Sequence, residues 1–162
     1  MKAIVALSAL FCLVAGSSAQ NQPADNSKIA FLAAEWVGKV AFRDEGESSA
    51  SITGSNYLRG RFIRLDLKFE SERMGKIEGM AMLSTGEDGV IRGYFFISEE
   101  PDPLVARGQL KDKKLTFVGT PLEGDGEVQI TFTITSPEAF TFEILSDGAE
   151  MLRGSFTKKK TS

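Results

Sequence analysis

The chain of 162 residues contains no histidine. Histidine is the usual general base at neutral pH and a common ligand of zinc, copper and haem iron. Its absence excludes Ser-His-Asp and Cys-His catalysis and removes the ordinary ligands of those metals. What remains is carboxylate, lysine, tyrosine and serine chemistry, so an enzyme is the least supported class of function and we predict no cofactor.

The sequence also has only one cysteine, Cys12, which lies inside an apolar run over residues 3–15. A lysine precedes this run and small residues follow it, which is the pattern of a secretory signal peptide. The run is shorter than the roughly 20 residues that cross a bilayer. We therefore predict a signal peptide over residues 1–19 and a secreted or periplasmic protein without a transmembrane segment. Cleavage after Ala19 leaves no cysteine for a disulfide.

An excess of positive charge is lacking too, because 22 acidic residues outnumber 19 basic ones and give a net charge of −3. Sequence-independent binding to nucleic acid needs a cationic surface, so we predict no nucleic-acid partner. The basic tail over residues 158–162 is interpreted as a solvated, frayed terminus.

The rest of the chain has the length of one domain, predicted over residues 28–157. Residues 20–27 are polar and are predicted to form a flexible lead-in. Apolar residues at helical spacing over residues 28–35, with Ser27 as N-cap, predict a short helix that packs against one end of the fold.

After Trp36 the hydrophobic period changes to two, most clearly over residues 63–70, 128–134 and 140–144. Turn-forming Gly, Pro, Asp and Ser separate these segments at hairpin spacing. No helical stretch is long enough for a parallel crossover. The sequence therefore predicts an all-β fold, a single antiparallel up-and-down β-barrel of about ten strands, because closure removes the exposed edges of such a meander.

Two segments, residues 77–83 and 90–97, are apolar on both faces. Their outer faces could be covered by the helix or by a partner chain, or their inner faces could line an apolar cavity. Met80 and Met82 suit a deformable pocket wall, although methionine also fills ordinary cores.

The order of several short motifs resembles the bacterial family catalogued as domain of unknown function 1579, over nearly all of residues 28–157. The motifs lie in the segments 31–38, 60–66, 93–96, 115–119 and 140–143. This resemblance implies a secreted or periplasmic relative of the calycin barrels, the group that contains lipocalins and fatty-acid-binding proteins. It does not imply an activity.

The resemblance also implies a barrel-closing contact in which Arg153, from the last strand, lies across the ring of Trp36 as a cation–π pair. Lipocalins usually have Gly-x-Trp at this place, whereas this chain has Ala34-Glu35-Trp36. Related haem-binding barrels need an axial histidine, which this chain does not have.

Charged residues offer few specific sites. The acidic segments 99–102 and 123–127 lack EF-hand spacing and are interpreted as solvated loops, so we predict no metal. Arg64 either belongs to a charged outer face or clamps an anionic head group at or inside a cavity mouth, since guanidinium binds carboxylate bidentately.

Our leading hypothesis is an exported binding protein that holds an apolar or anionic amphipathic small molecule inside the barrel. The alternative is a protein-interaction or structural module with a packed interior, covered by a partner or by a second copy as a homodimer. The candidate ligand-binding residues are Tyr57, Arg64, Met80, Met82, Tyr94 and Phe96.

Overall fold

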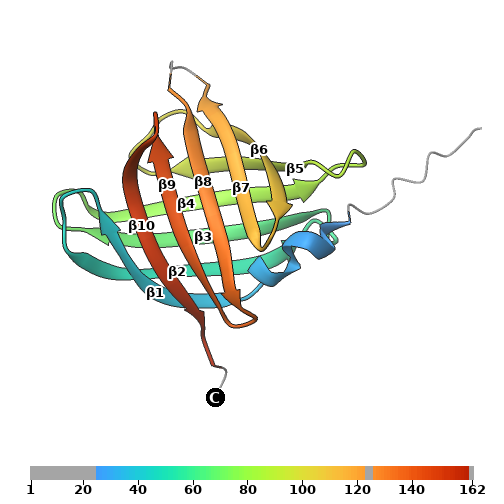
Figure 1. Ribbon diagram of the computed structural model, residues 1–162, viewed down its shortest axis with the longest axis horizontal. Coiled ribbons are helices and arrows are strands. Elements are labelled where there is room, and N and C mark those ends of the chain that lie inside the picture. The colour runs from blue at the N-terminus through green and yellow to red at the C-terminus, as the bar shows by residue number, and fades with distance from the viewer. Residues whose placement is uncertain (1–24, 123–125, 161–162) are drawn as a thin grey trace, which may run out of the picture.

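Figure 1 shows the computed structural model, which describes residues 25–122 and 126–160. A short 3-10 helix precedes ten strands that follow one another along the chain. The elements are η1 (Asn26–Leu32), β1 (Glu35–Phe42), β2 (Glu47–Tyr57), β3 (Phe62–Ser71), β4 (Gly75–Thr85), β5 (Ile91–Ile97), β6 (Leu104–Lys111), β7 (Lys114–Pro121), β8 (Val128–Ser136), β9 (Ala139–Ser146) and β10 (Ala149–Lys158).

The strands form one closed barrel in which each strand pairs with its neighbours in sequence, and β1 pairs with β10 to close the ring. All of these pairs are antiparallel. In Figure 1, β8, β9 and β10 run steeply across β2, β3 and β4, which lie behind them. The prediction of an all-β, antiparallel up-and-down barrel is confirmed.

Alternation along the strands fills the barrel interior with apolar side chains. On β3, Ile63 and Leu65 point inward and are fully buried, whereas Arg64 between them points outward. Phenylalanine rings bridge the interior: the ring centroids of Phe69 and Phe142 are 6.1 Å apart. These residues belong to β3 and β9, which are not neighbours in the barrel, so their contact spans the interior.

Inward-facing glycines make room for these rings. A Cβ atom at Gly108 would lie 2.6 Å from the Phe117 ring, and one at Gly93 would lie 2.6 Å from the Phe95 ring. The two rings are themselves in edge-to-face contact, with centroids 5.3 Å apart. Small and large residues thus alternate around the wall, as they do in small barrels whose interior is filled by side chains.

The N-terminal helix differs in type and position from the prediction. It is a 3-10 helix that begins at Asn26, and Asp25 rather than Ser27 caps it, since the Asp25 carboxylate accepts a hydrogen bond from the Ser27 N–H. Ile29 and Leu32 are fully buried. At seven residues the helix is longer than most 3-10 helices, which rarely exceed three or four residues.

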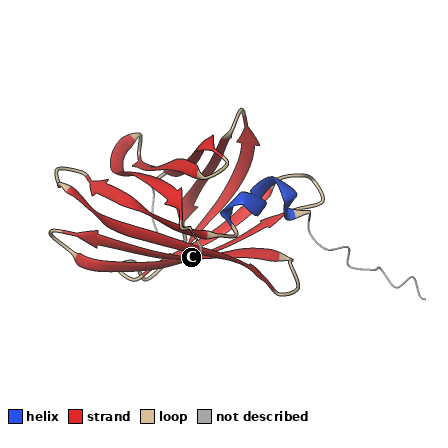
Figure 2. Cartoon of the chain, turned by 90° about the horizontal axis from the view of Figure 1, so that it is seen from below, coloured by secondary structure: helices blue, strands red, loops and turns tan. Residues whose placement is uncertain are grey.

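The helix closes one end of the barrel, as the sequence predicts, and Figure 2 shows it beside the strand ends. Asn26 fixes it there: its side-chain amide donates to the Gly60 carbonyl at 2.9 Å and accepts from the Thr85 N–H at 2.8 Å. Gly60 lies in the β2–β3 turn and Thr85 ends β4, so one side chain joins the helix to two hairpins.

Lys158 and Lys159, the first residues of the predicted basic tail, make regular contacts with β1. Lys158 ends β10, and the Lys159 ammonium group lies 2.8 Å from the Glu35 carboxylate. The hydrogen bond to this carboxylate raises the pKa of Lys159. The predicted signal peptide, and the predicted lead-in up to residue 24, lie outside the described residues.

Candidate functional site

The residues predicted to bind a ligand do not line the barrel interior. Met80 and Met82 flank the fully buried Ala81 on β4, so they point to the outer surface, and Tyr94 and Phe96 point outward from β5. The two methionines therefore do not line an inner pocket wall, because their side chains point out of the barrel. Because antiparallel partners share a face, the outward position of Arg64 places its register partner Met82 outward as well.

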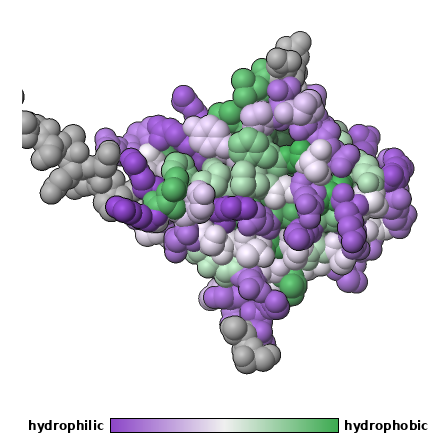
Figure 3. Space-filling model, turned by 180° about the vertical axis from the view of Figure 1, so that it is seen from behind, coloured by the Kyte–Doolittle hydropathy of each residue, from purple (hydrophilic) through white to green (hydrophobic). Residues whose placement is uncertain are grey.

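On the outer surface these residues gather into one patch. Register places Arg64, Met82, Tyr94 and Val105 side by side across β3 to β6, and Asp66, Met80 and Phe96 form the next row. We call these seven residues, together with Tyr57, the methionine–aromatic face. Tyr94, Phe96 and Val105 are 39%, 41% and 43% exposed. Figure 3, which views the side of β3 to β5, shows apolar residues across its middle with hydrophilic residues around them.

Val105 belongs to this face but was missed in the sequence. A signal was present, because Val105 alternates with the inward-facing Leu104 and Ala106 on β6. A valine at an outward position of a strand with only one dry face is the mark of an exposed apolar site.

Arg64 already has an anionic partner within the protein. Its Nε and Nη2 atoms both donate to Asp66 Oδ1, at 3.0 and 2.7 Å, and its guanidinium lies 5.9 Å from the centroid of the Tyr57 ring. The hydrogen bond to Asp66 raises the pKa of Arg64. An anionic head group would meet a guanidinium whose charge this carboxylate already neutralises, so the geometry does not favour the predicted clamp.

The predicted contact between Arg153 and Trp36 is absent. Trp36 is buried inside β1 opposite Lys158, whereas Arg153 lies opposite Ala41 and points outward. Five residues of strand separate these pairs, roughly 17 Å, and Arg153 pairs instead with Glu150 at 3.7 Å. The alternation of Leu152, Gly154 and Phe156 on the inner face of β10 accounts for the outward position of Arg153.

Trp36 contributes an unpaired polar atom to the interior. Its ring packs edge-on against Phe140, with centroids 4.8 Å apart, and its Nε1–H has no hydrogen-bond partner among the described residues. The hydroxyl group of Thr85, also buried, is unpaired in the same sense. A buried polar atom without a hydrogen-bond partner is energetically costly. A polar group that reached either atom would form a hydrogen bond that the protein itself does not supply.

The end of the barrel opposite η1 is closed on one side by Glu45, which lies between β1 and β2. Its side chain is 4% exposed. The carboxylate accepts hydrogen bonds from the Ser71 hydroxyl at 3.1 Å and from the Glu72 N–H at 2.9 Å. Glu45 thus ties the β1–β2 turn to the β3–β4 turn.

The other side of this end has an apolar rim. Ile97 lies at an inward-facing position of β5 yet is 40% exposed. Leu104, Val128 and Ile144 lie on the same inner face and are half-buried. This rim is the one described part of the inner wall where a large apolar side chain is that exposed.

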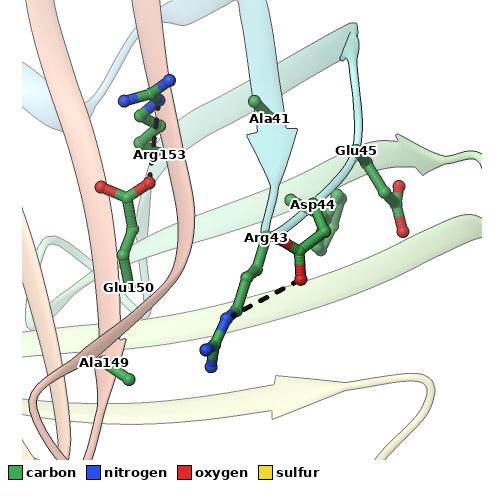
Figure 4. Close-up of a pocket in the computed structure, with 8 residues that line it drawn as sticks. Ala41, Arg43, Asp44, Glu45, Ala149, Glu150 and Arg153 are labelled. Atoms are coloured by element: carbon green, nitrogen blue, oxygen red, sulfur yellow. Dashed lines mark ion pairs between the residues drawn. The ribbon is translucent and has the colours of Figure 1, made fainter.

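Two polar hollows lie next to each other on the outer surface of β1 and β10. The first, of about 430 Å³, is drawn in Figure 4 and contains two ion pairs, Arg43–Asp44 at 3.9 Å and Arg153–Glu150 at 3.7 Å. The second, of about 510 Å³, shares Arg153 and extends across β9 and β8, where its lining residues include Thr131, Thr133 and Thr141. Both hollows lie on the side of the barrel away from the methionine–aromatic face.

The described residues form no cluster suited to metal binding, since no group of three or more acidic or cysteine side chains comes together. The remaining shifted pKa values belong to exposed carboxylates in local hydrogen bonds: Ser27 lowers the pKa of Asp25, and the Val90 N–H lowers that of Asp88. No helix within the described residues has the length and apolar character needed to cross a membrane.

Comparison with protein-family models and with curated proteins gave no match. Similar solved structures include a redesigned β-barrel (14% identity, TM-score 0.45, 81% of this chain and 94% of that one) and a de novo designed fluorescence-activating β-barrel (13%, 0.46, 78% and 92%). Another is the redesigned barrel mFAP0 bound to DFHBI, with 13% identity, a TM-score of 0.48, and coverage of 79% of this chain and 99% of that one. At this identity and TM-score the likeness carries no conclusion about ligand or function.

Proposed function

We propose that this protein is an interaction module that docks a protein surface on its methionine–aromatic face. The carrying observation is the exposure of Tyr94, Phe96 and Val105 on adjacent strands, next to two half-buried methionines. The largest contiguous apolar patch on a protein surface is often functional. Aromatic residues and methionine are the types enriched at the centres of protein interfaces.

The packed interior supports this proposal over a ligand chamber. Phe69 and Phe142 meet across the barrel, and Phe132 lies 4.9 Å from Phe142 and 5.7 Å from Phe140 between ring centroids. A site for a small molecule needs roughly 300 Å³ or more of enclosed space. Rings in mutual contact occupy the space that such a ligand would need.

A second candidate function is the binding of a small apolar molecule at the rim near Ile97. The exposure of this inward-facing isoleucine, with the half-buried Leu104, Val128 and Ile144 around it, favours it.

We propose the export of the protein and its family membership on separate grounds. The N-terminal apolar run supports export through a signal peptide, and the order of the motifs supports membership of the family with domain of unknown function 1579. The docked partner would then be exported as well.

Photo-crosslinking from two positions tests the docking proposal. A photoreactive phenylalanine analogue replaces Tyr94 on the methionine–aromatic face or, as a control, Thr141, which is exposed on the outer surface of β9. We expect ultraviolet light to give a covalent protein adduct from position 94 and none from position 141. No adduct from either position, together with a copurifying small molecule seen by native mass spectrometry, would replace docking by the second candidate.

A further inference from the structure

We infer that the protein surface docked on the methionine–aromatic face is the same face of a second copy, related by a twofold axis. This inference rests on the proposed function and adds the identity of the partner. Three features of the described residues support it: the shape of the face, the charges within it and the charges at its margins.

The shape of the face favours another sheet as its partner. Each strand of the barrel has a neighbour on both sides, so an extended peptide has no free edge on which to add a strand. The seven residues on β3 to β6 are spread over four adjacent strands of one continuous sheet. Sheet faces with alternating side chains pack on one another at about 10 Å, and a second copy supplies such a face.

The charges inside the face cancel one another. Arg64 is paired with Asp66 at 2.7 Å, and Lys68, just beyond them on β3, is paired with Glu78 at 3.6 Å. A face without net charge neither repels an identical face nor selects a strongly acidic or basic partner.

The charges at the margins are complementary under a twofold axis. Along β5 and β6 the margin toward η1 is basic, with Arg107 exposed, and the margin at the β5–β6 turn is acidic, with Glu100 exposed. Neither side chain has an ion-pair partner among the described residues. A twofold axis that lies between the two faces and runs across the strands brings the basic margin of one copy to the acidic margin of the other, twice per dimer.

The size of the face predicts a weak dimer. Four to five strands at about 4.8 Å spacing and three outward positions along each give roughly 400 Å² per copy. The total of about 800 Å² is in the range of weak, transient interfaces rather than permanent ones. We therefore expect a monomer at low micromolar concentration and a dimer at several hundred micromolar.

Sedimentation velocity over this concentration range, with thermal unfolding as a check of the fold, tests the inference. The double variant Tyr94→Ser and Phe96→Ser should stay monomeric throughout, and the control variant Thr141→Ser should dimerise like the wild type. Tyr94, Phe96 and Thr141 are all exposed at outward positions, so neither variant removes a buried contact.

A charge swap makes the test specific for a second copy. Arg107→Glu alone and Glu100→Lys alone should each weaken the dimer about fivefold, because each removes two exposed ion pairs. The variant with both changes should recover the wild-type dissociation constant, since the swapped charges meet again across the axis. A dimer dissociation constant that is unchanged in the Tyr94/Phe96 variant and in the charge variants would overturn the inference.

The crosslinking experiment separates this inference from the function on which it rests. An adduct from position 94 with twice the mass of the chain supports both. An adduct with a different protein, from a chain that sediments as a monomer at all concentrations, overturns the second copy and leaves the docking function in place. Absence of any adduct at several hundred micromolar, where the dimer is expected, overturns both.

Discussion

Single atoms decide how the interior of this barrel is filled. Gly108 has no side chain, and the Phe117 ring packs directly against it. A Cβ atom at this position would lie 2.6 Å from two ring carbons. Phe117 is fully buried and also touches the rings of Phe95 and Phe132. The ring therefore cannot move away from a methyl group without disturbing its aromatic neighbours.

We expect Gly108→Ala to destabilise the protein by about 1–2 kcal/mol. Overpacking a filled core costs roughly 1–3 kcal/mol, which outweighs the gain of about 0.4–1 kcal/mol from a less flexible unfolded chain. Urea unfolding measures the difference. Gly46→Ala is the matched control, because the nearest atom is the end of the Glu72 side chain, at 3.2 Å. Relief of the loss in the double variant with Phe117→Leu is expected, and simple additivity would contradict steric conflict as its cause.

The direction of individual side chains was predictable where one face of a strand is polar. Ile63 and Leu65 alternate with Arg64 and Asp66, so the inner face of β3 follows from the sequence. On β4, Met80, Ala81 and Met82 are all apolar, and hydrophobicity cannot tell inside from outside. The pairing register with β3 decides the question, and register depends on the turn between the strands rather than on composition.

Among the elements, η1 is held by few but specific contacts. Asn26 is 7% exposed and is the side chain that hydrogen-bonds both the β2–β3 turn and the end of β4. The sequence predicted a short helix here and its place at one end of the barrel. The role of Asn26 was not predictable, because its partners lie in distant hairpins. The cap at Asp25 is local, since it accepts from the Ser27 N–H two residues away, and the sequence offered both residues as N-caps.

We expect Asn26→Ala to lower the free energy of unfolding by about 2–3 kcal/mol. The change leaves the Thr85 N–H buried without an acceptor, and an unmade buried hydrogen bond costs roughly 1–3 kcal/mol. The lost bond to the part-buried Gly60 carbonyl adds to this. Urea unfolding gives the total, and amide exchange at Thr85 should become faster. Asn56→Ala, at an exposed position of β2, is the control. An equal loss of stability there would contradict the conclusion that Asn26 holds η1 against the barrel.

At the scale of the whole molecule, closure between β1 and β10 keeps every strand edge covered. The seam runs from Trp36 opposite Lys158 to Phe42 opposite Leu152. Closure of the meander was predictable because open edges invite aggregation. The choice of which face meets a partner was not, because it depends on how the register gathers apolar residues from β3 to β6 on the outer surface.

We expect a chain that ends at Gly148 to lose this closure and to regain it when a peptide of residues 149–160 is added. The shortened chain exposes the edges of β1 and β9, and the peptide can pair with both, as β10 does. Phe156 of the peptide would return to its stacked position, with its ring centroid 5.2 Å from that of Phe140. Trp36, the single tryptophan, reports the change by fluorescence, because it is buried in the seam.

Two altered peptides separate closure of the barrel from nonspecific binding. Phe156→Ser removes an inward ring and should abolish the recovery of Trp36 fluorescence, whereas Thr157→Ser changes an exposed position and should leave it intact. If both peptides restore the signal equally, strand pairing alone drives assembly. A shortened chain that is already a folded monomer would show that nine strands can close without β10. Loss of recovery only with Phe156→Ser would mean that the packed interior, and not the hydrogen-bonded seam by itself, selects the tenth strand.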